Sequence, residues 1–395
     1  MRNRLLFVAL SLVFGIVAAV GLAEAVLAWH APDSVILPFY NELHPYVMFR
    51  PPASSVFEAP PHAMSHEQTP VRHYTNADGL RVEAPDYDLP TRKPARQLRV
   101  AVLGSSAIQL GSTYETTLPG ALRQVLRERY PGRDIEVINA GIQSCVSRQS
   151  IAHLLFTVID YQPDVVLLYD GVNDLGLPLT YDSRPNYPYN FQTMVEAWDA
   201  YRSAAQDPLW KTLLGRSRLY AAWRTRFEPG TDNTTVNTVA LGLSRPPHSL
   251  SAQQVLDSPD YVREHVAAYL ANWRQLIVLS GAYGYEPICV LQPTGGFDRE
   301  YAIPIMQQTF GMDADVAEQW IDAFASLYSE ADRQIETLQG EYPDRVILNL
   351  SNYLTPASEN FWDTVHVYDE VNRKVAVRIL ESSGETIETR MGLAN

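Results

Sequence analysis

Residues 98–106 read Leu-Arg-Val-Ala-Val-Leu-Gly-Ser-Ser. The first six form a short, mostly apolar run that contains two β-branched valines, which is typical of a buried β-strand. Gly104 and the two serines after it suit a tight turn from this strand into a helix. The stretch therefore predicts a strand with a polar turn at its carboxyl end.

The same order of strand and helix repeats along the chain. Strands are expected at about 98–103, 135–138, 164–169, 287–291 and 345–350. Helices are expected at about 118–129, 147–160, 259–281, 314–339 and 368–382. Strands that alternate with helices predict an α/β fold of three layers, in which helices cover both faces of a parallel five-stranded sheet.

Composition limits the classes of function. The chain has 395 residues, of which 46% are hydrophobic, so it can bury a substantial core. Lys and Arg number 31 against 45 Asp and Glu, which gives a net charge of −14. A surface this acidic repels phosphates, so we expect no nucleic-acid partner. Two cysteines are too few for a disulfide-rich scaffold or a four-cysteine zinc site.

The N-terminus carries an export signal. Arg2 and Arg4 precede an uncharged apolar run from Leu5 to Ala23, which is close to the length of about 20 residues that a helix needs to cross a bilayer core. The two positive charges predict that the N-terminal end stays cytoplasmic and that the rest of the chain is exported. The run exceeds the usual core of a signal peptide, which favours a transmembrane anchor, although residues 23–25 also form an Ala-Glu-Ala site for cleavage.

Five segments follow from these patterns. Residues 1–29 are the signal anchor or signal peptide, and residues 30–96 are an irregular extension rich in Pro, His and Tyr. The main domain spans 97–385, and 386–395 is a tail. Within the main domain the alternation stops at about 177–250, which is too long for an ordinary connection and predicts an insertion.

The extension and the insertion carry two further predictions. Short strands are expected near Tyr74–Arg81, where residues 76–79, Asn-Ala-Asp-Gly, form a turn signal. The insertion is rich in aromatic residues, which can line the substrate pocket or pack the insertion onto the sheet. These aromatic residues include Tyr181, Tyr187, Tyr189 and Trp210, and a helix is expected at about 194–205.

Polar residues follow four of the expected strands. They lie at 104–106, at 139–141, at 170–174 and, beyond a short loop, at 363–366. Because the carboxyl ends of parallel strands meet at one edge of the sheet, these residues are expected to converge there. They supply a hydroxyl, a glycine amide, a carboxamide, a carboxylate and an imidazole, which are the parts of a serine nucleophile with its base and oxyanion hole.

These four blocks, in this order, resemble those of the SGNH (GDSL-like) serine hydrolase family. The resemblance implies Ser106 as the nucleophile and His366 as its base, held by Asp363. It also implies that the Ser106 amide, the Gly141 amide and the Asn173 side chain form the oxyanion hole. The family fold is flavodoxin-like, with strand order 2-1-3-4-5.

The resemblance covers residues 97–385 and includes one departure. The family often has Gly-Asp-Ser in its first block, whereas here Ser105 takes the position of the aspartate. Ser105 is therefore the alternative nucleophile, although Ser106 keeps the family spacing from Gly104. No cofactor is implied, and we expect no metal: His62, His66 and His73 in the extension are expected to be solvated loop residues.

Cys145 follows the second expected strand and Cys289 lies within the fourth, and in the implied strand order these two strands are three spacings of about 4.8 Å apart. A disulfide needs Cα atoms within about 7 Å, so two free, buried thiols are expected.

The sequence thus predicts a membrane-anchored, extracytoplasmic serine ester hydrolase that acts on an acyl or acetyl ester of a small molecule or a glycan. Two alternatives remain open. One is an O-acyltransferase, in which a hydroxyl of an envelope polysaccharide replaces water, and the other is a catalytically silent carbohydrate-binding protein. An α/β-hydrolase of the Gly-x-Ser-x-Gly type is disfavoured because that motif does not occur.

Overall fold

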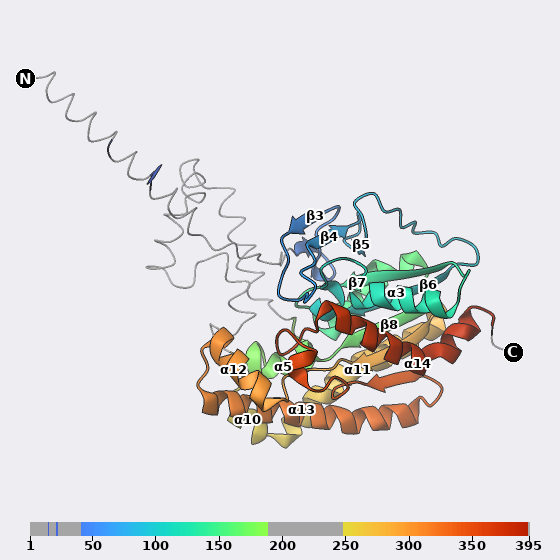
Figure 1. Ribbon diagram of the computed structural model, residues 1–395. Coiled ribbons are helices and arrows are strands. Elements are labelled where there is room, and N and C mark those ends of the chain that lie inside the picture. The colour runs from blue at the N-terminus through green and yellow to red at the C-terminus, as the bar shows by residue number, and fades with distance from the viewer. Residues whose placement is uncertain (1–14, 16–20, 23–40, 189–247, 394–395) are drawn as a thin grey trace, which may run out of the picture. The chain divides into compact units, whose positions relative to one another are not determined.

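The computed structural model describes residues 15, 21–22, 41–188 and 248–393 (Figure 1). Its centre is an eight-stranded sheet with the order β10-β9-β8-β6-β7-β5-β4-β3. The strands of this sheet are β3 (Val56–Ala59), β4 (Val71–Thr75), β5 (Arg81–Val82), β6 (Leu98–Gly104), β7 (Ile135–Gly141), β8 (Val165–Asp170), β9 (Glu286–Leu291) and β10 (Val346–Asn349). The hairpin of β1 (Glu42–His44) and β2 (Met48–Arg50) forms a separate small sheet.

The parallel part of the sheet has the predicted order. β7, β6, β8, β9 and β10 are the five expected strands, and they lie side by side in the order 2-1-3-4-5. Gly104 at the end of β6 is opposite Gly141 of β7 on one side and Tyr169 of β8 on the other. The turns after these three strands therefore leave the same edge of the sheet as neighbours.

The prediction of a five-stranded sheet was wrong in its total, because the extension adds three antiparallel strands. β5 pairs with the edge of β7, and β4 and β3 continue the sheet outward. The predicted turn between β4 and β5 is confirmed: Asn76 Oδ1 accepts hydrogen bonds from the amides of Asp78 and Leu80, at 3.0 and 2.9 Å. The segment from residue 41 onward is thus part of the fold and not an irregular appendage.

Helices cover both faces of the sheet. They are α2 (Ser106–Gln109), α3 (Leu118–Arg129), α4 (Ser147–Phe156), α5 (Val172–Thr180), α10 (Ala252–Leu256), α11 (Pro259–Tyr283), α12 (Arg299–Phe310), α13 (Ala314–Glu341) and α14 (Asn372–Arg390). Along β6, Val100 and Val102 pack under α3 and α14, whereas Ala101 and Leu103 pack under α4, α11 and α13. This alternation, with both faces buried, explains why each parallel strand is an almost continuous apolar run.

Local sequence signals explain the helix ends that were predicted well. Thr117 caps α3 by accepting a hydrogen bond from the Gly120 amide at 3.1 Å, and Pro119 lies in the first turn. α11 begins at Pro259 and ends before Gly284, whose φ of 76° is a left-handed conformation that favours glycine. Both helices lie within two residues of their expected bounds.

The last helix differs from its prediction. It was expected at 368–382, but residues Asp369–Val371 form a 3-10 turn and α14 runs from Asn372 to Arg390. The Asp369 carboxylate accepts hydrogen bonds from the Ser112 amide, which holds this turn against the rest of the domain. α14 also continues past residue 385, where the sequence pattern placed the end of the domain. α12 was not predicted, since Pro304 interrupts its helical pattern.

The insertion leaves and rejoins the domain at one point. Asp182 and His248 form a bridge, and the Ser183 amide donates to the carbonyl of His248 at 2.9 Å. Tyr181 is buried and stacks with Tyr187 at a ring separation of 6.4 Å, so these two aromatic residues pack at the base of the insertion. Tyr189, Trp210 and the helix expected at 194–205 lie outside the described residues.

The apolar segment at Leu5–Ala23 also lies almost wholly outside the described residues. Among the helices that are described, none is long and apolar enough to cross a bilayer.

The two thiols are free and buried, as predicted. Cys145 Sγ contacts the carbonyl of Gly104 at 3.4 Å and the Ser150 hydroxyl at 3.5 Å. Burial raises the pKa of Cys145 to about 12 and raises that of Cys289 well above its ordinary value.

Candidate active site

A chain of hydrogen bonds joins three of the residues that were predicted from the sequence. Ser106 Oγ lies 2.7 Å from His366 Nε2, and His366 Nδ1 lies 2.7 Å from Asp363 Oδ2. An ionised carboxylate can only accept, so Nδ1 carries the imidazole proton and Nε2 accepts from the serine hydroxyl. This is the tautomer in which His366 can remove the Ser106 proton. Of the two adjacent serines, Ser106 is the one that His366 contacts.

Gly104 allows β6 to turn sharply into α2 and thereby places Ser106. Its φ of 154° is rare for other residues, and a Cβ here would lie 2.2 Å from the Tyr169 carbonyl oxygen. Ser106 is the first residue of α2, so its N–H has no acceptor within the helix. The side chain is largely buried, with 8% of the residue exposed. The hydroxyl and its own amide thus lie together at the carboxyl edge of the sheet.

The loop that carries His366 is held by its own carboxylate and by the segment after β9. Asp363 Oδ1 accepts hydrogen bonds from the amides of Val365 and His366, at 2.7 and 2.6 Å. The carbonyl of Thr364 accepts from Thr294 Oγ1 at 2.8 Å and from the Gly295 amide at 3.1 Å. The loop conformation is therefore set before any substrate binds.

Asp363 stays ionised in this environment. Burial by itself raises the pKa of the Asp363 carboxyl, but the charge of protonated His366 and the hydrogen bonds from His366 and Val365 outweigh it. The net effect places the pKa of Asp363 below its ordinary value. A carboxylate that remains charged can hold the imidazole tautomer and stabilise the imidazolium.

Asn173 lies on the first turn of α5, beside the strand that ends at Asp170. Gly171 precedes this helix with a φ of 125°, and a Cβ there would lie 2.3 Å from a methyl carbon of Leu291. Asn173 Nδ2 donates one hydrogen bond to the Cys145 carbonyl at 2.7 Å. Because an amide nitrogen has two hydrogens, the second N–H can be offered to a substrate oxygen.

Gly141 differs from the expected arrangement. Its N–H donates to Asn139 Oδ1 at 3.1 Å, so this predicted oxyanion donor already has an acceptor in the protein. Asn139 Nδ2 also donates to the Ile108 carbonyl at 2.9 Å, which ties α2 to the end of β7. A Cβ on Gly141 would lie 2.6 Å from the Gln109 amide nitrogen, so glycine permits this close approach. The participation of the Gly141 amide in an oxyanion hole stays a prediction.

Two buried carboxylates under the site were not assigned a role from the sequence. Asp174 accepts hydrogen bonds from the Ser147 amide at 3.1 Å and from the Ser147 hydroxyl at 2.6 Å. Asp170 Oδ1 accepts from Tyr269 at 2.7 Å and Trp273 at 3.1 Å. Burial raises the pKa of Asp174 to about 6, and burial together with the charge of Asp174 raises that of Asp170 well above its ordinary value. These two groups anchor the turns after β7 and β8.

An aromatic contact at the site was also missed. The Trp362 ring stacks on the His366 ring, with centroids 5.1 Å apart and planes inclined by 15°. His62, from the extension, meets the Trp362 ring edge-on at 5.3 Å and 81°. Trp362 directly precedes Asp363 in the sequence, which was an available signal, whereas nothing local to His62 indicated this contact.

The three histidines of the extension do not gather into a metal site. His62 contacts Trp362, His66 pairs with Glu370, and His73 lies on β4, where burial lowers its pKa well below the ordinary value. Within the described ranges, no three His, Cys, Asp or Glu side chains are placed to hold a metal ion. The expectation that all three would be solvated was wrong for His62 and His73, which are both partly buried.

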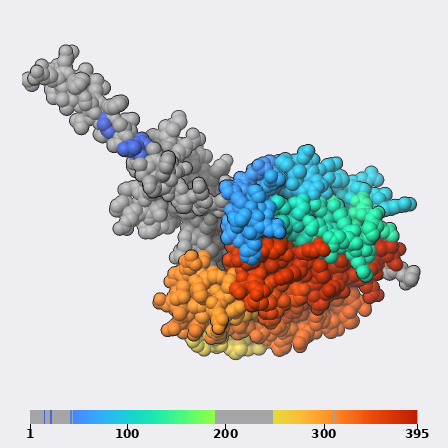
Figure 2. Space-filling view, in the orientation of Figure 1, coloured from blue at the N-terminus to red at the C-terminus, as the bar shows by residue number. Residues whose placement is uncertain are grey.

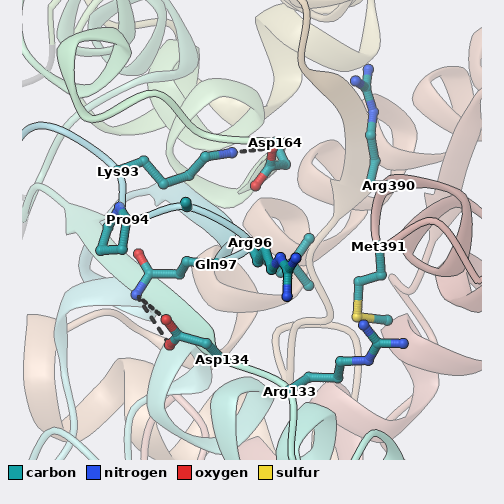
Figure 3. Close-up of a pocket in the computed structure, with 11 residues that line it drawn as sticks. Lys93, Pro94, Arg96, Gln97, Arg133, Asp134, Asp164, Arg390 and Met391 are labelled. Atoms are coloured by element: carbon teal, nitrogen blue, oxygen red, sulfur yellow. Dashed lines mark hydrogen bonds and ion pairs between the residues drawn. The ribbon is translucent and has the colours of Figure 1, made fainter.

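A surface hollow of about 560 Å³ lies at the other edge of the sheet (Figure 3). It is lined by residues that precede β6, β7 and β8, among them Lys93, Asp134 and Asp164, and by the end of α14. Lys93 pairs with Asp164, and Gln97 donates to Asp134, so these polar groups satisfy one another. The catalytic candidates are at the opposite, carboxyl ends of these strands, so this hollow is separate from them.

Comparisons with known proteins give distant likenesses of fold. No protein-family model and no curated protein sequence matches the chain. Among solved structures, the chain is similar to the acetylxylan esterase Axe2 from Geobacillus stearothermophilus, with 14% identity, a TM-score of 0.35 and coverage of 73% of this chain and 94% of that one. It is also similar to a protein described as a GDSL-like lipase from Parabacteroides merdae, with 14% identity, a TM-score of 0.40 and coverage of 73% of this chain and 95% of that one. For LAE5, an α/β hydrolase from the metagenome of Lake Arreo, the identity is 13%, the TM-score is 0.33, and the coverage is 75% of this chain and 96% of that one.

Proposed function

We propose that the protein is a serine ester hydrolase that cleaves acyl or acetyl esters through an acyl-enzyme on Ser106. The observation that carries the proposal is the continuous chain of two 2.7 Å hydrogen bonds from Ser106 through His366 to Asp363. A serine hydroxyl is a weak nucleophile unless a base removes its proton during attack. Here a base with the correct tautomer is already in hydrogen-bond contact.

The mechanism follows from these positions. Ser106 Oγ attacks the ester carbonyl carbon while its proton moves to His366 Nε2. The imidazolium then gives this proton to the leaving alcohol, and the acyl group stays on Ser106. Water attacks the acyl-enzyme with His366 again acting as base, and release of the acid restores the hydroxyl. Asp363 holds the ring and stabilises its positive charge without taking the proton.

The negative oxygen of the tetrahedral intermediate needs hydrogen-bond donors. Among the described residues, the Ser106 amide at the start of α2 and the second N–H of Asn173 have no protein acceptor, so both are available as donors. The Gly141 amide would join them by sharing or leaving its hydrogen bond to Asn139. A ligand-free site of this kind commonly tightens when the reacting group binds.

The proposal extends to the location of the protein. The charges at Arg2 and Arg4 and the uncharged run after them favour a membrane anchor with the catalytic domain on the extracytoplasmic side. A reporter fused after Asn395 that functions only in the cytoplasm should remain silent. A strong signal from it would overturn this part of the proposal.

The decisive test of the activity uses the full-length protein with a series of p-nitrophenyl esters and acetylated glycans. We expect ester cleavage by the parent and its loss in Ser106→Ala. Free acid and transferred ester are both quantified with a sugar acceptor present: free acid supports a hydrolase, whereas transferred ester as the main product supports an acyltransferase. Binding of a glycan without turnover of any ester would support the silent carbohydrate-binding alternative.

A further inference from the structure

The extension reaches the candidate active site through a short segment, residues 62–66, which we call the strap. The Asp369 amide donates to the Met64 carbonyl at 2.9 Å, and the Met64 side chain is buried. The His66 ring contacts the Tyr368 ring, with centroids 3.8 Å apart and planes inclined by 33°, and His66 pairs with Glu370. In Figure 2 the surface of the N-terminal strands adjoins that of the C-terminal region. The strap is therefore docked along the chain that directly follows His366.

His62 is fixed at the start of the strap. Its Nδ1 accepts a hydrogen bond from the Met64 amide at 3.3 Å, and its carbonyl accepts from the Ser65 amide at 3.2 Å. An Nδ1 that accepts places the ring proton on Nε2, which is the neutral form of histidine. Burial lowers the pKa of His62, although the charge of Asp363 opposes this effect. His62 thus meets the catalytic loop as an uncharged, oriented ring.

Three rings follow one another from the strap to the serine. His62 meets Trp362 edge-on at 5.3 Å, Trp362 lies parallel to His366 at 5.1 Å, and His366 holds Ser106. We propose that His62 is a positioning residue of the active site, which holds the Trp362 ring against His366. This inference rests on the proposed function, because it assigns a further residue to the same site.

The physical reason lies in what His366 must do. Its ring can rotate about the bond that joins it to the side chain, yet both nitrogens must keep their partners during turnover. An indole face parallel to the ring restricts that rotation and attracts the positive imidazolium that forms when Ser106 is deprotonated. The indole ring in turn contacts the His62 ring, which restricts the movement of the indole. Loss of His62 should therefore lower the rate of the chemical step and leave binding of the substrate largely unchanged.

The test is a double-mutant cycle in the full-length protein, read as kcat and KM for an ester and as the rate at which a fluorophosphonate labels Ser106. We expect His62→Ala to lower kcat and the labelling rate about 10-fold, a loss typical of one cation–π or ring contact, with KM within about twofold. His62→Phe, which keeps a ring against Trp362, should retain most of the rate. In a Trp362→Leu background, His62→Ala should have no further effect, because the two residues act in series.

His66→Ala is the matched control, since it removes a second strap histidine that contacts the same chain away from His366. We expect its kcat to stay within about twofold of the parent. An equal loss in His66→Ala would show that docking of the strap matters in general and would overturn the specific role of His62. Three other results would also overturn the role of His62. They are an unchanged rate in His62→Ala, a loss in His62→Phe as large as in His62→Ala, and a full additional loss from His62→Ala in the Trp362→Leu background. If the parent itself is neither labelled nor active, the proposed function fails, whereas a labelled parent with an equally labelled His62→Ala refutes this inference alone.

Discussion

Ser106 Oγ and His366 Nε2 lie 2.7 Å apart although 260 positions separate the two residues in the chain. Ser106 is placed by the end of β6 and His366 by the loop after β10, and both ends face the same edge of the sheet. Each residue has a partner that orients it: the sharp turn at Gly104 for the serine and Asp363 for the imidazole. The contact is thus a product of the whole domain.

Asp363→Asn should retain more activity than His366→Ala. The asparagine can still bond to the imidazole, but it can present an N–H to Nδ1 and favour the wrong tautomer, which costs on the order of 10⁴-fold in a comparable triad. His366→Ala removes the base itself and should cost more, on the order of 10⁶-fold. Both are measured as kcat on one ester, with circular dichroism as the check of folding. Equal or greater loss in Asp363→Asn would contradict the assigned division of roles.

Asn173→Ala should lower kcat about 10²- to 10³-fold, the usual cost of one oxyanion donor. The measurement should use a good ester substrate, so that chemistry limits the rate. The same change leaves the Cys145 carbonyl without its donor, so a thermal unfolding curve must accompany the assay. Near-normal turnover in a folded variant would remove Asn173 from the oxyanion hole.

The buried carboxylates make stability depend on pH. The folded-state pKa of Asp174 is about 6, above the value of about 3.9 for an unfolded aspartate. Between these values the folded protein holds more protons than the unfolded chain, so the contribution of Asp174 to the free energy of unfolding falls as the pH rises. Compared with Asp174→Asn, the parent should therefore lose stability between about pH 4 and pH 7.

Urea unfolding midpoints of both proteins at several pH values measure this difference. The Asp174→Asn variant removes one titrating group and keeps the size of the side chain, so carboxylates that do not interact with Asp174 cancel in the comparison. The charge of Asp174 also raises the pKa of Asp170, which adds to the loss of stability in the parent in the same direction. A difference in midpoint that stays constant, or that moves in favour of the parent as the pH rises, would show that Asp174 is ionised throughout.

The two thiols should resist modification in the folded protein. Thiol reagents attack the thiolate, and burial raises the pKa of both Cys145 and Cys289 while it also blocks access. We expect slow reaction with a coloured disulfide reagent at pH 8 and two equivalents of thiol after denaturation. Rapid reaction in the folded state, or fewer than two thiols after denaturation, would contradict the buried, unpaired state of these residues.

The parallel sheet was predictable because its information is local. Each parallel strand is buried on both faces, so it appears as an apolar run, and helices such as α3 carry their own capping signals. The turn at residues 76–79 predicted short strands near Tyr74–Arg81, but β3 to β5 have only two to five residues, which is too few for a periodic pattern that shows where they pair. They become strands because β7 offers an edge: Arg81 pairs with Asn139, far along the chain.

The candidate site also contains features that the sequence predicted and features that it did not. Ser106, Asp363 and His366 belong to short motifs at strand ends, and the resemblance of these motifs to the SGNH family implied their roles before the structure showed their hydrogen bonds. The hydrogen bond from Gly141 to Asn139, by contrast, depends on the exact direction of one amide. The contact between His62 and Trp362 depends on where a strap from the extension docks, and no pattern within either segment encodes it.

The central claim is that Ser106 carries the acyl group. The most direct measurement traps the acyl-enzyme formed from a p-nitrophenyl ester by acid quench and locates the added mass by peptide mass spectrometry. The same experiment on Ser105→Ala and Ser106→Ala separates the two adjacent hydroxyls. The account predicts an adduct on the peptide of the parent and of Ser105→Ala, at Ser106, and none on Ser106→Ala. An adduct at Ser105, or undiminished ester hydrolysis by Ser106→Ala, would contradict it.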